Sequence, residues 1–198
     1  DSELTVWFSV PSTGIFMRRL GALKPESYPA LRWSLFCGEP LPATVAHAWT
    51  EAAPNSIVEN LYGPTEVTIA CTLHRWDPER SPALCERGLV PIGEPYPGMR
   101  ALIVDEQLRP VPEGEVGELL MSGPQVTLGY LDDPGKTAAA FVIPPGEREI
   151  HYRTGDLVRR LGPGLPIVYV RRGDQQIKIQ GHRVELGEIE AVLRRESG

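Results

Sequence analysis

The first half of the chain alternates short apolar runs with stretches whose apolar residues recur at helical spacing. Apolar runs typical of buried strands lie at 5–10, 31–37 and 56–61. Amphipathic stretches between them predict helices over 12–21 and 42–51, and Ser12 or Thr13 can cap the first helix. Strands that alternate with helices favour a parallel sheet with crossover helices, whose ligands bind beyond the carboxyl ends of the strands.

The pattern changes from residue 92 onward, where Gly, Pro and Asp separate short strand-like runs. These runs lie at 100–104, 115–121, 150–152, 157–160 and 167–170. They predict a compact β-barrel or curled sheet, with a brief helix at 137–141. We place a hinge at Gly173 and Asp174, followed by a hairpin over 176–186 and the start of an amphipathic helix over 187–195.

These patterns predict an α/β fold in three parts. The first is a partial parallel α/β sheet subdomain over 1–98, and the second is a small β-barrel-like subdomain over 99–173. The third, over 174–198, is the hinge and the first hairpin of an α+β C-terminal subdomain. The chain begins with a strand and ends as a helix starts, so we expect it to be cut from something longer.

Composition is that of a globular protein and narrows the function classes. The 198 residues are 41% hydrophobic, and a net charge of −6 without clustered Lys and Arg predicts no nucleic-acid partner. Cys37, Cys71 and Cys85 form no close-spaced metal motif, so reduced thiols in a cytoplasmic protein are the simplest account. No apolar run approaches the roughly 20 residues of a membrane span, so we expect no membrane contact.

The stretch 60–66, NLYGPTE, carries the most chemistry. Its tyrosine can stack on a base, its asparagine can pair with a base edge, and its Gly-Pro turn lets backbone approach a ligand. Thr65 and Glu66 offer oxygens to a phosphate-bound magnesium ion. Taken alone, such a stretch is more often an ordinary loop after a strand than a nucleotide site.

Four further stretches change that balance. They are GELLMSG at 117–123 with GYL at 129–131, YRTGDL at 152–157, RGDQQIKI at 172–179 and VELGEIE at 184–190. With 60–66 they resemble, in order and spacing, the fifth to eighth core motifs of adenylate-forming enzymes, in particular the adenylation domains of nonribosomal peptide synthetases. That family activates an amino acid with ATP and Mg²⁺, and then passes it to the phosphopantetheine thiol of a peptidyl carrier protein.

The resemblance implies an adenine site near the end of the third predicted strand. Asn60 would meet the adenine amino group, Tyr62 would stack on the ring, and Gly63 would give the loop its close approach. The backbone on the other side of the ring would come from Gly38, Glu39 and Pro40.

The resemblance also assigns the phosphate and ribose contacts. Thr65 would touch phosphate, Glu66 would hold magnesium, and Asp156 would accept hydrogen bonds from both ribose hydroxyls. Arg172 would approach the ribose or phosphate, with Tyr169 packed nearby. For Asp156 the alternative is a local turn cap, since Thr-Gly-Asp is a common turn.

Two assignments concern the later half of the family's cycle. Asp174 would be the hinge about which the C-terminal subdomain rotates. Lys178 would serve in thioester formation, although a lysine between Ile177 and Ile179 is also what a half-exposed strand shows.

Alignment to the family also implies half of a substrate pocket. Its lining would be Thr13, Leu35, Cys37, Leu61, Ile69 and Ala70. These side chains are small or apolar, so we expect a neutral, apolar or small amino acid. The segment LFCGEPLP at 35–42 also resembles D-alanine-activating members, in which a cysteine narrows the pocket.

The chain departs from the family at several places. Arg171 stands where glycine is usual, Gln180 replaces an arginine, and 126–129 reads VTLG. The phosphate loop, the aspartate for the substrate amine and the C-terminal lysine are not in this sequence, so we expect catalysis to need the remainder of the adenylation domain. Two alternatives stay open: an acyl- or aryl-CoA ligase, and an inactive nucleotide-binding module.

Overall fold

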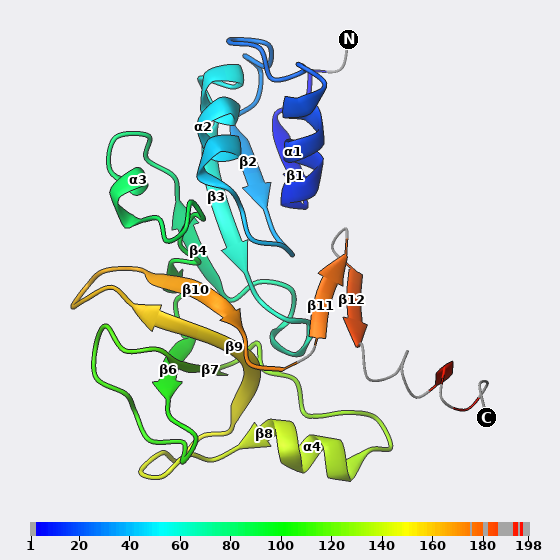
Figure 1. The fold of residues 1–198 in the computed structure, drawn as a ribbon, viewed down its shortest axis with the longest axis vertical. Coiled ribbons are helices and arrows are strands. Elements are labelled where there is room, and N and C mark those ends of the chain that lie inside the picture. Colours follow the sequence, from blue (N-terminus) through cyan, green and yellow to red (C-terminus); the bar gives the residue numbers. More distant parts are fainter. Residues whose placement is uncertain (1–2, 175, 180–181, 186–191, 194, 196–198) are drawn as a thin grey trace.

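The computed structural model describes residues 3–174, 176–179, 182–185, 192–193 and 195. Its first part is a five-stranded sheet in the order β1-β2-β3-β4-β5 (Figure 1). The strands are β1 (Val6–Ser9), β2 (Trp33–Phe36), β3 (Ile57–Tyr62), β4 (Thr72–Arg75) and β5 (Glu94–Pro95). The first three pair in parallel, which confirms the sheet predicted from the apolar runs.

Strands β4 and β5 are the elements of this sheet that the sequence pattern misses. Strand β4 runs antiparallel to β3, and β5 runs antiparallel to β4, so the sheet is mixed. Only Thr72 of the four residues of β4 is buried, which leaves no apolar run to detect. Its position follows from the tight return of the chain after β3, which needs no crossover helix.

Two helices cover one face of this sheet: α1 (Pro11–Arg19) and α2 (Ala43–Ala52). Trp49 of α2 is fully buried against the sheet, with its ring centroid 5.0 Å from that of Phe36. Its indole N–H donates to Ser34 Oγ at 2.8 Å, so the ring is fixed by packing and by a hydrogen bond.

The predicted cap of α1 is wrong. Val10 is the N-cap residue and makes no side-chain cap bond, while Pro11 occupies the first turn. The free N–H of Ser12 instead donates to Glu39 Oε2 at 2.8 Å. A residue that follows β2 therefore caps the preceding helix, which local sequence could not reveal.

The second part is an antiparallel sheet in the order β10-β9-β7-β6, with β8 also paired to β9. The strands are β6 (Arg100–Val104), β7 (Gly117–Ser122), β8 (Phe141–Val142), β9 (His151–Arg160) and β10 (Ile167–Arg172). This confirms the curled sheet. Short helices α3 (Ser81–Leu84) and α4 (Pro134–Ala140) lie on the connections, and the Asp133 side chain caps α4.

Strand β9 corrects one prediction. The runs at 150–152 and 157–160 are not separate strands but one strand of ten residues. Gly155, which reads as a breaker, lies inside it at a φ of 70°. A glycine at such an angle bends a strand without ending it.

The two sheets share a core at their junction. One buried cluster joins Tyr62, Val67 and Cys71 from the first part to Leu119 and Val158 from the second. Ile92 and Gly93 donate from their backbone N–H groups to the carbonyl of Ile167, so backbone hydrogen bonds also cross the junction.

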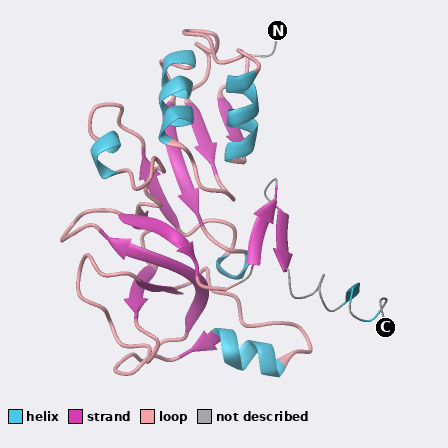
Figure 2. Ribbon diagram, in the orientation of Figure 1, coloured by secondary structure: helices cyan, strands magenta, loops and turns pink. Residues whose placement is uncertain are grey.

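After Asp174 the backbone forms the predicted hairpin, in which β11 (Gln176–Ile179) pairs antiparallel with β12 (His182–Glu185) (Figure 2). Most of the predicted helix at 187–195 lies outside the described residues. None of the helices in the described part of the chain is long and apolar enough to cross a membrane.

Candidate functional site

The loop that follows β3 is held in an unusual backbone conformation. It contains the short 3₁₀ helix η1 (Thr65–Val67), and then Thr68 and Ile69 with φ of 58° and 70°. Two successive non-glycine residues in the left-handed region are strained and need support from their surroundings.

That support comes from the segment after β7. Thr68 Oγ1 donates to the Gln125 carbonyl at 2.9 Å, and Gln125 Nε2 donates back to the Ala70 carbonyl at 3.0 Å. The N–H of Thr127 donates to the Glu66 carbonyl at 2.9 Å. Residues 125–127, which lie within the sixth motif, therefore hold the loop that follows the fifth motif at 60–66. The residues at 126–129 differ from those usual in the family, but the backbone hydrogen bond from Thr127 is still made.

Gly63 is required by close packing within this loop. A Cβ on Gly63 would lie 2.7 Å from Ala70 Cα and 2.8 Å from the Ile69 carbonyl oxygen. The close approach expected of this glycine is thus made to the returning backbone of its own loop.

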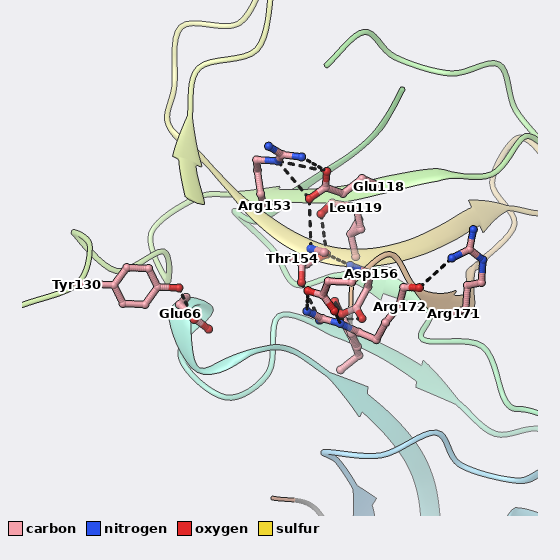
Figure 3. Close-up of polar contacts among 12 residues, drawn as sticks. Glu66, Glu118, Leu119, Tyr130, Arg153, Thr154, Asp156, Arg171 and Arg172 are labelled. Atoms are coloured by element: carbon pink, nitrogen blue, oxygen red, sulfur yellow. Dashed lines mark hydrogen bonds and ion pairs between the residues drawn. The ribbon is translucent and has the colours of Figure 1, made fainter. Parts of the chain in front are cut away.

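Glu66 and Thr65 are neighbours in the sequence but differ in burial. Glu66 is buried, and Tyr130 donates from its hydroxyl to Glu66 Oε1 at 2.6 Å (Figure 3). Lys136 Nζ lies 4.9 Å from the centre of the Tyr130 ring. Thr65 is exposed. The Tyr130 contact was not foreseen, because 64 residues separate it from Glu66.

Asp156 is the centre of a second polar cluster, between the two sheets. Its side chain is 7% exposed, and both carboxylate oxygens accept hydrogen bonds. Tyr62 donates from its hydroxyl to Oδ2 at 2.5 Å, and Arg172 Nη1 donates to Oδ1 at 3.0 Å. Burial, followed by the Asp156 charge, raises the pKa of Tyr62 well above its usual range, so the phenol remains a donor.

Arg172 connects this cluster to the predicted hinge. Its Nη1 also donates to the Thr154 carbonyl at 2.8 Å, and its Nε donates to Asp174 Oδ1 at 2.9 Å. The second guanidinium contact, from Nη2 to Asp174 Oδ2, is 2.5 Å long. One planar side chain thus ties Asp156, the bend at Thr154 and Asp174 together.

The remaining residues expected at the adenine site lie on β3, β10 and the loop after β2. Asn60 is buried and donates to the carbonyls of Val90 and Pro91 at 3.3 and 2.8 Å, while its Oδ1 has no hydrogen-bond partner among the described residues. Gly38, at a φ of 99°, and exposed Pro40 lie beyond β2. Tyr169 is half-buried on β10.

The predicted substrate residues are brought together only in part. Cys37, Leu61 and Ala70 form one buried cluster with Leu35 beside it. The cluster also includes Leu73 and Tyr96, which the sequence analysis missed because β4 was not predicted. The other two predicted members are half-buried Thr13 on α1 and exposed Ile69, which are not part of this apolar cluster.

Ile69 turns its side chain outward, with 65% of it exposed, and presents its carbonyl to Cys37 Sγ at 3.7 Å. The Lys178 side chain lies outside the described residues. Nothing in the structure therefore bears on its expected role.

The comparison with protein families decides the affiliation. A model described as "AMP-binding enzyme" matches residues 1–131, which is most of the chain. The chain belongs to the AMP-binding enzyme family. Within it, the chain is 39% identical over 197 residues to a D-alanine–D-alanyl carrier protein ligase of Lacticaseibacillus rhamnosus. The match covers 98% of this chain and 37% of that ligase.

Two solved structures are similar to this chain in sequence and in fold. The adenylation domain AlmE of Vibrio cholerae, in complex with glycyl-adenosine-5'-phosphate, is 42% identical with a TM-score of 0.83. PA1221, a nonribosomal peptide synthetase protein with adenylation and carrier domains, is 29% identical with a TM-score of 0.83. Each match covers 98% of this chain, and 36% and 38% of the respective structure.

Proposed function

We propose that this chain forms part of an amino-acid adenylation domain, and that it works with the remainder of such a domain. The domain would join an amino acid to AMP and then pass it to the phosphopantetheine thiol of a carrier protein. The observation that carries the proposal is the convergence of Glu66, Tyr62 and Asp156 at the junction of the two sheets. The named relatives, which are carrier-protein ligases and adenylation domains, support the same class.

The reaction joins two anions, so positioning and charge neutralisation are the main tasks. A carboxylate oxygen attacks the α-phosphorus of ATP, the bond to the bridging oxygen breaks, and pyrophosphate leaves. In our proposal Asp156 exchanges its contact with Tyr62 for the ribose hydroxyls, which are equally good donors. Arg172 stays beside it and supplies positive charge near the phosphates.

In our proposal Asn60 and Tyr62 make the adenine contacts. The Asn60 acceptor oxygen, which has no partner in the described part of the chain, would take the adenine amino group. Released from Asp156, the Tyr62 ring would stack on the base, with the backbone of 38–40 opposite.

Glu66 fits a magnesium ion that is held mainly by phosphate. Within the described residues no three His, Cys, Asp or Glu side chains gather into a metal site. A single buried carboxylate that Tyr130 orients is the pattern expected when phosphate oxygens and water complete the coordination. When bound, magnesium would neutralise phosphate charge. Thr65, exposed beside Glu66, would contact the same phosphates.

The substrate class is proposed to be a small, neutral amino acid. The cluster around Cys37 and Leu61 is built from apolar side chains, and the Glu59 carboxylate, whose charge reaches Tyr96, is already paired with Arg75 at 2.9 Å. The D-alanine and glycyl groups in the names of similar proteins agree with a small side chain. Cys37→Trp should fill this space and abolish activation.

Amino-acid-dependent exchange of pyrophosphate into ATP tests the proposal. We expect the full-length polypeptide that carries this chain to exchange with glycine or alanine and not with lysine or glutamate. Exchange that needs no amino acid, or none with any amino acid, would contradict it. Exchange supported by a fatty or aromatic acid with transfer to free CoA would favour the ligase alternative. ATP binding without turnover would favour an inactive module.

A further inference from the structure

The pairing of β9 is irregular on both of its edges at the point where Asp156 projects: β9 bulges against β7, and Val170 of β10 is the extra residue on the other edge. Against β7, Arg153 pairs with Leu120 and Leu157 with Glu118, so three residues of β9 lie opposite Leu119 alone. Against β10, the register also shifts between Tyr169 and Arg171, next to the pairing of Arg172 with Asp156. Bulges bend a strand and redirect a side chain, and here the redirected side chain is the Asp156 carboxylate.

The bulge leaves backbone groups without ladder partners, and side chains satisfy them (Figure 3). Thr154 Oγ1 donates to the Leu119 carbonyl at 2.7 Å and accepts from the N–H of Asp156 at 3.0 Å. The N–H of Gly155 donates to Glu118 Oε1 at 3.2 Å. Glu118 is therefore the side chain that fixes the tip of the bulge.

Glu118 is itself held in place. Arg153 donates to it through Nη2 at 2.6 Å and through Nε at 3.2 and 3.3 Å, in a forked arrangement. The Glu118 side chain is only 16% exposed. A partly buried, charge-assisted pair of this kind has one preferred geometry, so it defines the position of the Gly155 N–H.

The tip of the bulge, Gly155, lies directly against the polar cluster of Tyr62, Asp156, Arg172 and Asp174, which we call the nucleotide cluster. A Cβ on Gly155 would lie 2.9 Å from both Arg172 Nη2 and Asp174 Oδ2. The ends of the Arg172 and Asp174 side chains therefore lie directly against Gly155, so a shift of Gly155 towards them would displace them.

We propose that Glu118 is a positioning residue for nucleotide binding, which it supports by holding the Gly155 bulge so that Asp156 and Arg172 face the ribose. It touches no substrate in this account. The inference rests on the proposed function, because it requires that Asp156 binds the ribose hydroxyls.

The test uses Glu118→Ala and Glu118→Gln in the full-length polypeptide, assayed by pyrophosphate exchange with ATP, 2'-deoxy-ATP and 3'-deoxy-ATP. The matched control is Glu86→Ala. Glu86 pairs at 2.8 Å with Arg159, which lies on β9 like Arg153, and the Glu86 side chain is 17% exposed. Arg159, however, lies beyond the bulge. Asp156→Ala provides the reference for a lost ribose contact.

We expect Glu118→Ala to raise the KM for ATP about tenfold, as loss of one well-placed hydrogen bond does, with the KM for the amino acid unchanged. Its preference for ATP over the deoxy analogues should fall towards that of Asp156→Ala. Glu118→Gln, which keeps the volume and one acceptor oxygen, should lie between. Glu86→Ala should keep the wild-type preference.

The inference is overturned if folded Glu118→Ala or Glu118→Gln protein keeps the full preference for ATP, whatever its melting temperature. Loss of preference in Glu86→Ala to the same extent would also overturn it, since a general stability effect would then suffice. A wild-type enzyme that exchanges but ignores the ribose hydroxyls would refute the ribose role of Asp156. Absence of exchange altogether would instead refute the proposed function.

Discussion

At the scale of single residues, the site depends on carboxylates that are buried and yet satisfied. Asp156 accepts from Tyr62 and Arg172, and Glu66 accepts from Tyr130. A buried carboxylate without donors would be costly and would tend to take up a proton. These donors satisfy both carboxylates and aim them before any ligand arrives.

Tyr130→Phe should weaken the response to magnesium. It removes one hydrogen-bond donor to Glu66 and keeps the ring, so the magnesium concentration for half-maximal exchange should rise several-fold, as loss of one charge-assisted hydrogen bond predicts. The control is Tyr28→Phe, because Tyr28 donates to the Ala22 carbonyl in the first sheet's helical layer. An unchanged magnesium requirement in Tyr130→Phe would mean that this contact does not tune Glu66.

His74 gives a pH dependence with a defined sign. Burial lowers the pKa of His74, whose Nε2 lies 2.9 Å from Ser81 Oγ. As the pH falls through the ordinary value of 6.5, the unfolded chain takes up a proton that the folded chain refuses. Stability is therefore lost below pH 6.5, by at most about 1.4 kcal/mol per pH unit for this one group.

His74→Gln should reduce that loss. We would compare urea unfolding of the two proteins at pH 7.5 and 5.5, since groups common to both cancel in the difference. A variant that loses as much stability as wild type on acidification would show that His74 is not the responsible group.

At the scale of elements, hydrophobic periodicity predicted the buried strands and failed for strands whose positions depend on tertiary contacts. β1, β2 and β3 carry continuous apolar runs and were predicted. β4 is mostly half-exposed, so the local pattern missed it. β9 contains Gly155, so the pattern divided it into two strands. The contacts of Tyr130 and Glu118 join residues 64 and 35 or more positions apart, and no sequence period encodes them.

Gly155→Ala tests the bulge as an element. The substitution is strained by its φ of 70° and would also press on Arg172 and Asp174. Gly164→Ala is the matched control, because Gly164 has a φ of 68° and nothing lies within 4 Å of its added Cβ. We expect about 1 kcal/mol of destabilisation from the angle alone in Gly164→Ala.

Gly155→Ala should lose clearly more stability than this control in urea unfolding, and its KM for ATP should rise, because Arg172 must move. Equal stability losses together with an unchanged KM for ATP would contradict the tight packing of the bulge against the nucleotide cluster.

At the scale of the whole molecule, the site lies where two sheets meet and share a core. In our proposal the first sheet supplies Tyr62 and the apolar cluster around Cys37, and the second supplies Asp156 and Arg172. The motif resemblance identified most of these residues. The hydrogen bonds of Tyr62 and Arg172 to Asp156 had to come from the structure, because they join residues 94 and 16 positions apart on different strands.

The central claim is that one site at this junction holds both the adenosine and the amino-acid parts of an aminoacyl-adenylate. The most direct measurement is the inhibition of exchange by AMP and by alanyl-sulfamoyl-adenosine, a stable adenylate analogue, in the full-length polypeptide. We predict that Asp156→Ala weakens both inhibitors, while Cys37→Trp weakens the alanyl analogue and leaves AMP unchanged. If Asp156→Ala binds AMP as wild type does, or if Cys37→Trp binds the alanyl analogue undiminished, the claim is contradicted.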